Sequence, residues 1–202
     1  MARLAGPSIR RVCTRREKSV SESPNDFHPH HRTERLILPG WRESDLDAYA
    51  EMMADPEVTR FVGGVVARND AWRGLTSMIG HWVFRGFGLW AVERKRDGAL
   101  VGRVGVQYPE GWPSTEVAWT LGRQYWGEGY ATEAAKASFA WGFGTLPVPK
   151  LISLIDPENH ASQRVAERLG QAKGGKATLV LGGKSYDDLD VWEITRDRWS
   201  KA

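Results

Sequence analysis

The sequence predicts a single α/β (α+β) domain in which helices and strands alternate along the chain. Three observations point to this class. Segments in which apolar residues alternate with polar ones are interleaved with segments of helical spacing. The composition is that of an ordinary globular protein, and 202 residues suit one core better than two. A glycine-rich turn, YWGEGYATEA at 125–134, links a strand to a helix.

The first half of the predicted domain holds four strands and two helices. RLILPGW (35–41) is a strand stopped by Pro39–Gly40, and SDLDAYAEMMADPE (44–57) is a helix with Ser44 as N-cap and Pro56 just beyond its end. A second helix runs from about Asn69 to Phe84. GFGLWAVERK (86–95) and ALVGRVGVQY (99–108) form an antiparallel hairpin turned at Asp97–Gly98, and TEVAWTL (115–121) is the fourth strand.

The second half holds two helices and three strands. ATEAAKASFAWGF (131–143) is helical, KLISLI (150–155) is a buried strand, and ENHASQRVAERLG (158–170) is a helix ended by Gly170. ATLVLGGKSYDDLDVWEI (177–194) is a closing hairpin turned at Gly182–Gly183. The predicted order is therefore β-α-α-β-β-β-α-β-α-β-β, with about seven strands.

Residues 1–32 are predicted to be a flexible basic extension, and residues 33–202 the folded domain. The extension holds seven Lys or Arg against three Asp or Glu, so its net charge is +4. Because the whole chain has a net charge of +3, the remaining residues carry −1. It has few large apolar residues and no sustained period. A solvated leader is the simplest interpretation. A nucleic-acid-binding arm and a targeting peptide are the alternatives, although Glu17 and Glu22 argue against targeting.

Composition also bounds the location and the metal chemistry. No apolar run approaches the roughly 20 residues that cross a bilayer, and the first residues show no apolar signal core, so a cytoplasmic protein is expected. The single cysteine, Cys13, allows no internal disulfide. His28, His30 and His31 have no acidic or cysteine partner at chelating spacing, so no metal is assigned.

The glycine-rich turn is suited to binding phosphate. Gly127, Gly129 and Ala131 keep side chains away from the start of a helix, where backbone N–H groups lack partners and the helix dipole is positive. A tight turn that packs the helix on the sheet is the alternative. A dinucleotide-binding fingerprint is set aside because Thr132 stands where a third small residue is needed. GGKS at 182–185 is set aside as a phosphate loop because no helix follows it.

Four motifs together resemble the GNAT acetyltransferase superfamily. TERLIL (33–38), DPEVTRF (55–61), WGEGYATEA (126–134) and ENHASQRVAERLG (158–170) occur in the order typical of its ribosomal-protein-alanine acetyltransferase (RimJ/RimL-like) branch. The resemblance covers about residues 33–196. It implies a GNAT fold, whose mixed, mostly antiparallel sheet is flanked by helices and split between its fourth and fifth strands. Acetyl-coenzyme A would lie in that opening.

The resemblance also implies which residues meet the cofactor. The pyrophosphate would lie on the backbone amides of Trp126, Gly127, Glu128, Gly129, Tyr130, Ala131 and Thr132, and the pantetheine arm along Trp119, Thr120 and Leu121. Asn159 would cap its helix or bond the pantetheine amides. The chain departs from the branch at Ala118–Trp119, where Gly-Tyr is common, and at Pro39, where an arginine is common. The first departure puts the acceptor in more doubt than the cofactor.

Acyl transfer to an amine requires removal of a proton from the amine, because amines are mostly protonated at neutral pH. Glu116, at the start of the fourth strand, is the candidate base, and a solvated strand-end carboxylate is the alternative. Ser162 matches a position where relatives place a hydroxyl near the leaving sulfur, and a serine that only bonds backbone is the alternative. His160 is interpreted as a surface residue. Trp41, Trp90 and Trp112 are expected to border the acceptor cleft.

The predicted activity is acetyl-coenzyme A-dependent N-acetylation of a primary amine. The acceptor is left open between a protein N-terminus and a small amine, such as an amino acid, a polyamine or an antibiotic. A non-catalytic coenzyme A-binding regulatory module of the same fold is the alternative, in which Glu116 and Ser162 would be dispensable. A nucleic-acid-binding protein is a distant third. The oligomeric state, a homodimer included, is also left open.

Overall fold

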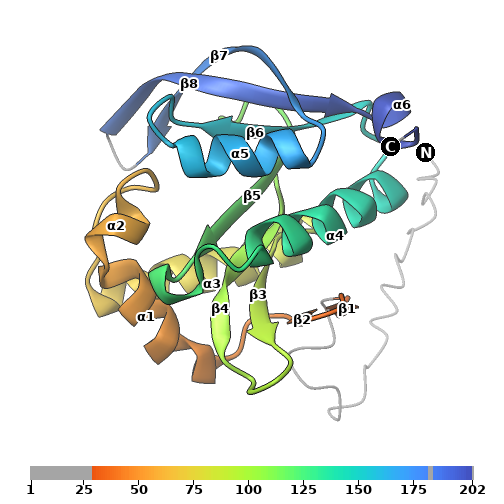
Figure 1. Ribbon diagram of the computed structural model, residues 1–202. Coiled ribbons are helices and arrows are strands. Elements are labelled where there is room, and N and C mark those ends of the chain that lie inside the picture. The colour runs from red at the N-terminus through yellow and green to blue at the C-terminus, as the bar shows by residue number, and fades with distance from the viewer. Residues whose placement is uncertain (1–28, 182–183, 202) are drawn as a thin grey trace, which may run out of the picture.

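A computed structural model describes residues 29–181 and 184–201 of the chain. Within these residues, eight strands form one sheet in the order β1-β2-β3-β4-β5-β6-β8-β7, with helices on both faces (Figure 1). Every neighbouring pair is antiparallel except β5 and β6, which are parallel. The predicted class is confirmed, and the sheet has one strand more than expected. The turn predicted at Gly182–Gly183 lies outside the described residues.

The additional strand is β1 (His31–Arg32), which pairs with β2 (Leu36–Leu38). These two residues were assigned to the flexible extension, so the ordered chain begins earlier than residue 33. Pro29 also contacts the domain, because its carbonyl accepts a hydrogen bond from the Trp90 indole at 2.9 Å. Residues 1–28 lie outside the described residues.

The predicted helices of the first half are present with shifted ends. A 3-10 turn, η1 (Glu43–Asp45), precedes α1 (Leu46–Ala54), so Ser44 lies inside this turn and is not the N-cap. Pro56 opens a short helix, α2 (Pro56–Thr59), which the Asp55 side chain caps by accepting from the Glu57 N–H. The helix α3 (Arg68–Arg85) ends at Gly86, whose φ of 74° suits glycine.

The remaining elements follow the predicted order. Strands β3 (Leu89–Arg94) and β4 (Leu100–Gln107) form a hairpin, and β5 (Glu116–Leu121) adds to it. The turn η2 (Arg123–Tyr125) leads to the long helix α4 (Tyr130–Thr145). The last elements are β6 (Lys150–Ile155), α5 (His160–Arg168), β7 (Ala172–Leu181), β8 (Lys184–Thr195) and α6 (Arg196–Trp199).

Apolar side chains fill both faces of the sheet. The helix α4 packs on one face, with Phe139 among β-strand residues such as Val104, and α1 and α3 pack on the other. Trp41 and Trp90 are buried in these two layers, with 2% and 0% of their surface exposed. Neither lines the cavity between β5 and β6, so the expectation that they border the acceptor cleft is wrong for both. No helix in the described part of the chain is both long and apolar enough to span a bilayer.

The sheet is split between β5 and β6, as the resemblance implied. Only one residue pair, Glu116 and Ile152, joins these strands in register, and the two strands then diverge (Figure 1). The Ser153 hydroxyl adds one bond across the split, to the Val117 carbonyl at 2.7 Å. Because β6 diverges from β5, the part of β5 near Leu121 has no neighbouring strand on that side among the described residues. There the Trp119 indole contacts Ser162 of α5.

Candidate active site

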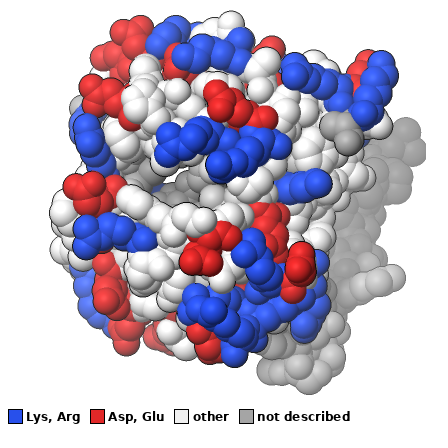
Figure 2. All heavy atoms as spheres, viewed as in Figure 1, with Lys and Arg blue, Asp and Glu red and all other residues white. Residues whose placement is uncertain are grey.

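A cavity of about 290 Å³ lies along β5 at the split. Figure 2 shows the surface hollowed between the β6–β8 half of the molecule and the β4–β5 half, with Lys and Arg side chains near the opening. Its walls combine apolar and polar groups. The apolar side chains include Phe61, Val62, Leu89, Trp112, Leu179, Tyr186 and Leu189, and the polar ones include Arg103, Gln107, Glu116, Thr120, Asp156, Asn159 and Ser162.

Glu116 is held at the closed end of the split by three hydrogen bonds. One carboxylate oxygen, Oε2, accepts from the Gln107 amide at 2.8 Å and from the Trp112 indole at 2.6 Å. The other, Oε1, accepts from the Leu154 backbone N–H at 3.0 Å. Only 5% of the residue is exposed, so the alternative of a solvated carboxylate is wrong. Since each oxygen can accept two bonds, Oε1 keeps one acceptor position for a ligand.

Burial raises the pKa of Glu116, because removing a carboxylate from water disfavours its charged form. The hydrogen bonds from Leu154, Trp112 and Gln107 act in the opposite direction, as does the positive charge of Arg103. The balance is a pKa above the ordinary value of 4.5. A carboxylate of raised pKa is a stronger base, while its three donors keep its orientation fixed.

Ser162 faces Glu116's strand from the other side of the opening. It lies in the first turn of α5, and its Oγ accepts a hydrogen bond from the Trp119 indole at 3.3 Å. The hydroxyl proton is thereby left to be donated elsewhere, and no described contact takes it to backbone. Asn159 caps α5, as predicted, because its Oδ1 accepts from the Ser162 N–H at 3.1 Å. Both side chains line the cavity.

The loop between β5 and α4 exposes a row of backbone donors. Gly127 and Gly129 have φ angles of 81° and 80°, a conformation that side chains rarely adopt. Gly129 is the N-cap of α4 and brings no side chain to cap it. Among the described residues, no acceptor bonds the backbone N–H of any residue from 127 to 132. Unpartnered N–H groups at the positive end of a helix dipole suit an anion such as a phosphate.

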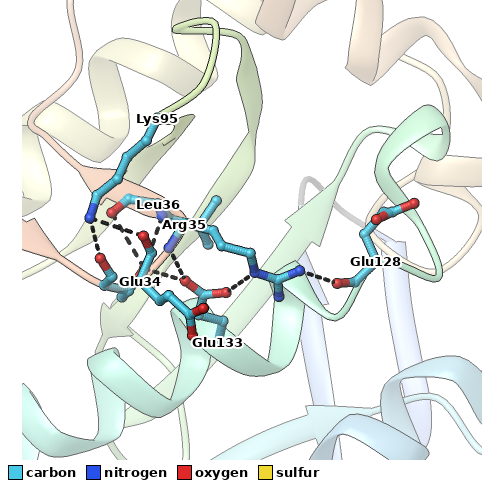
Figure 3. A network of polar contacts seen from close by, with 7 residues as sticks. Glu34, Arg35, Leu36, Lys95, Glu128 and Glu133 are labelled. Carbon is cyan, nitrogen blue, oxygen red and sulfur yellow. Dashed lines mark hydrogen bonds and ion pairs between the residues drawn. The ribbon is translucent and has the colours of Figure 1, made fainter.

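An ion-pair network connects this loop and the start of α4 to Thr33 and Arg35, which lie just before β2 (Figure 3). Arg35 donates through Nε to Glu133 Oε2 at 2.7 Å and through Nη1 to the Glu128 carbonyl at 2.8 Å. The Arg35 backbone N–H and the Thr33 hydroxyl both donate to Glu133 Oε1, at 2.8 and 2.5 Å. The guanidinium also lies 4.6 Å from the centre of the Tyr130 ring. Glu133 therefore ties the first turn of α4 to the residues just before β2, and none of Thr33, Arg35 and Glu133 lines the cavity.

Comparison with known proteins agrees with this geometry. Residues 35–171 match the family model described as the acetyltransferase (GNAT) domain. The chain belongs to the GNAT acetyltransferase family. The protein YkkB of Bacillus subtilis, named as uncharacterized, is 31% identical over 164 residues, which cover 77% of this chain and 95% of that protein. Other relatives are named N-acetyltransferases, which identifies this GNAT protein as an acyltransferase.

Solved structures show the same fold. An acetyltransferase from Agrobacterium tumefaciens strain C58 is 32% identical, with a TM-score of 0.71 over 83% of this chain and 94% of that one. A spermidine N-acetyltransferase from Vibrio cholerae, solved with coenzyme A and spermine, is 17% identical, with a TM-score of 0.66 over 82% and 98%. The GNAT family uses acetyl-coenzyme A. In this chain, the unpartnered N–H groups at 127–132 and the free edge of β5 fit that molecule's phosphates and its amide-bearing arm.

The predicted site residues fall into two groups. Glu116, Trp119, Thr120, Asn159 and Ser162 line the cavity, whereas residues 126–132 form the loop at the far end of β5. The side chains of Leu121 and Tyr130 are buried, so only their backbone can serve a ligand, and the Trp126 indole is occupied by the Leu121 carbonyl at 2.9 Å. Within the described residues, no group of three or more His, Cys, Asp or Glu side chains could hold a metal ion.

Sequence reasoning missed several wall residues. Arg103 and Gln107 reach the cavity from β4, and Tyr186 reaches it from β8. The signal available for Arg103 was a single charge within the apolar and glycine pattern LVGRVGVQ. Of the three tryptophans expected at the cleft, only Trp112 lines it.

Proposed function

We propose that this GNAT protein transfers the acetyl group of acetyl-coenzyme A to a primary amine. The observation that carries the proposal is the split between β5 and β6. One end of the split presents the N–H groups of residues 127–132, and the cavity beside it is lined by a buried carboxylate and a hydroxyl. The proposal assigns anion binding to the first end and proton transfer to the second.

In this proposal, the cofactor contacts are mostly made by backbone. The loop amides of Gly127, Glu128, Gly129, Tyr130, Ala131 and Thr132 bind the pyrophosphate, whereas the Trp126 N–H, also predicted to do so, already donates to the Arg123 carbonyl at 3.1 Å. The edge of β5 at Trp119, Thr120 and Leu121 bonds the pantetheine arm. The Asn159 side-chain oxygen is used as the helix cap, while its N–H₂ group has no acceptor among the described residues and donates to the same arm.

Two side chains carry the chemistry. Glu116 accepts the amine's proton at the open position of Oε1, directly or through a water, and the neutral nitrogen then attacks the thioester carbon. Ser162 donates a hydrogen bond to the sulfur as the carbon–sulfur bond breaks, which stabilises the charge on the leaving thiolate. The second proton, which the nitrogen loses on becoming an amide, protonates that thiolate, so the products are the acetylated amine and the free thiol. We also propose that the protein belongs to the RimJ/RimL-like branch and acts in the cytoplasm. The acceptor in this proposal is either a peptide N-terminus or a small molecule.

The direct test combines binding with turnover. Isothermal titration with coenzyme A should show binding, and thiol release from acetyl-coenzyme A should occur with at least one member of a panel of amines and N-terminal peptides. Gly129→Val should abolish or sharply weaken binding, because it adds a branched side chain at a φ of 80° beside the phosphate position. Gly80→Ala, in the middle of α3 with open space around it, is the matched control.

Two results would contradict the proposal. Unchanged coenzyme A affinity in a folded Gly129→Val protein would show that the loop does not bind the pyrophosphate. Coenzyme A binding with no turnover on any amine would favour the regulatory module instead.

A further inference from the structure

Arg103 is a cationic side chain that lines the cavity and to which the proposed function gives no role. It lies on β4 opposite Thr120 of β5, on the sheet face that α1 and α3 cover. Its Nη1 donates to the Tyr49 hydroxyl at 3.0 Å, and its Nε lies 3.3 Å from the Thr120 hydroxyl oxygen. Glu116 precedes Thr120 by four residues on β5, so it lies on the same face of the sheet, and it lines the same cavity.

No carboxylate pairs with Arg103 anywhere in residues 29–181 and 184–201. Its hydrogen-bond partners are neutral: Nε and Nη1 donate to the two hydroxyl oxygens, and Nη1 also lies 4.0 Å from the Met78 sulfur. Of the five N–H donors of a guanidinium, the two on Nη2 have no partner among the described residues. The charges of Arg103 and of the Glu116 carboxylate attract each other within the cavity, but the two groups form no ion pair, so no carboxylate accepts from the guanidinium. The remaining donors therefore leave a place in the cavity where a ligand's anionic group would be stabilised.

The other charges of the cavity set the polarity of the acceptor. Glu116 and Asp156 are its acidic groups, and Asp156 uses Oδ1 to accept from the Glu158 N–H at 2.8 Å. An amine that delivers its proton to Glu116 places the rest of the molecule toward Arg103. A cation in that second position is repelled, whereas a carboxylate can accept two parallel bonds from a guanidinium.

On the basis of the proposed function, we propose that the acceptor is a small amine that also carries a carboxylate, of the free amino-acid class. Arg103 binds the carboxylate and thereby determines specificity. The apolar walls of the cavity at Phe61 and Tyr186 suit the apolar part of such a molecule. A peptide N-terminus, whose first residue has no free carboxylate, fits this arrangement less well.

The test uses sets of acceptors that differ in one group. Each set holds an L-amino acid, its amide and its decarboxylated amine, and several side chains are covered. The wild type should prefer the amino acid within a set, and Arg103→Gln should lower kcat/KM for it by about 10- to 100-fold, mainly through KM. The same variant should leave the amide and the amine nearly unchanged. Differences in amine ionisation cancel when each variant is compared with the wild type on one compound.

Two further variants separate binding of the carboxylate from effects on folding. Arg103→Lys keeps the charge but loses the fork of donors, so it should retain part of the amino-acid preference. Arg73→Gln removes an arginine that pairs with Asp70 on the exposed surface of α3, and it should behave like the wild type on every compound. Coenzyme A affinity and the thermal midpoint are measured for each variant to show that it is folded.

The outcomes distinguish this inference from the function it rests on. If neutral amines or peptides are acetylated as well as amino acids, or if Arg103→Gln lowers all three compounds of a set equally, Arg103 does not bind a carboxylate, although the enzyme remains an acetyltransferase. If Arg103→Gln does not fold, a wild-type preference for amides or amines over amino acids overturns the inference. Absence of turnover on every compound, with coenzyme A bound, contradicts the proposed function itself.

Discussion

At the scale of single residues, Glu116 combines two opposing influences. Burial raises its pKa, and three donors that bond the carboxylate limit the rise. A folded-state pKa above the unfolded value means that deprotonating Glu116 costs stability as pH rises through that pKa. The protein keeps a carboxylate here at a cost to stability, which is the pattern expected of a group retained for its chemistry.

Glu116→Gln tests this role. If Glu116 is the base, turnover should fall by about two to four decades while coenzyme A affinity barely changes. The wild-type rate should rise with pH through an ionisation above the ordinary glutamate value, and the variant should lack that limb. Glutamine also turns one N–H₂ toward the three donors, so the thermal midpoint must be recorded beside the kinetics. Retained activity with an unchanged pH profile would assign the proton to another route.

Ser162→Ala should give a smaller loss than Glu116→Gln. The variant removes a donor to the leaving sulfur, and it also leaves the Trp119 indole without its acceptor. The loss should shrink when the leaving thiol is made more acidic, because a better leaving group needs less help from a donor. Rates with thioesters of graded thiol pKa measure this directly. A loss of the same size for every thiol would mean that Ser162 only positions Trp119.

At the scale of elements, the sequence predicted those helices and strands whose signals come from a few neighbouring residues. The presence of α3 and β6 and the cap at Asn159 follow from periodicity and capping, which act over a few residues. Short elements such as β1 and α2 hold too few residues to show a period. The positions of Trp41 and Trp90 depend on packing between distant elements, so composition could not separate core tryptophans from those of the cleft.

The register of β4 against β5 marks the same limit for the site. It brings Gln107 opposite Glu116 and Arg103 opposite Thr120, and no motif in either strand specifies that pairing. Glu116 was identified because it starts a recognisable strand. The other walls of the cavity were not identified, because they come from elements that are far apart in the chain.

The Arg35–Glu133 network stabilises the glycine loop, and the pKa of Glu133 makes this contribution depend on pH. Burial raises the pKa of Glu133, but hydrogen bonds from Thr33 and from the Arg35 backbone and side chain outweigh it, so the pKa lies below 4.5. A lowered folded-state pKa gives stability that is present above the unfolded value and lost as pH falls through the folded one. The network therefore contributes at neutral pH and fails in acid.

Glu133→Gln should accordingly lower the thermal midpoint at neutral pH. The ion pair is worth at most about 1 kcal/mol, because Arg35 is partly exposed and solvent screens it. The gap between wild type and variant should stay constant above about pH 5 and narrow toward pH 3. Coenzyme A affinity should also fall, because the Glu128 carbonyl and Tyr130 lose their fixed contact with Arg35. A gap that does not depend on pH would assign the effect to packing.

At the scale of the whole molecule, the sheet holds together two halves that are joined by few contacts at the split. One half, β1 to β5, carries Arg103 and the glycine loop, while the other, β6 to β8 with α5, carries Ser162 and Asn159 (Figure 1). Glu116 bonds across the junction to the Leu154 N–H. The proposed base therefore also helps to fix the angle at which the halves open.

The N-terminal segment packs on the first half, which gives a prediction about truncation. Deleting residues 1–28 should leave the thermal midpoint and coenzyme A affinity nearly unchanged, because this segment has few large apolar residues that could join a core. Deleting residues 1–32 removes β1, the Pro29–Trp90 hydrogen bond and the edge-on contacts of the His31 ring with Trp90 and Trp141. Those contacts are worth about 1–2 kcal/mol, so the midpoint should fall by several degrees.

The difference between the two truncations should also depend on pH. Burial lowers the pKa of His31 from 6.5, and its Nε2 is buried without a hydrogen-bond partner among the described residues. Below about pH 6.5 the unfolded chain binds a proton more readily than the folded one, so this contact loses stability as pH falls. The stability gap between the two truncated proteins should therefore narrow from pH 8 to pH 5. Thermal unfolding across this range measures it, and a gap that is absent at pH 8 would show that β1 does not stabilise the domain.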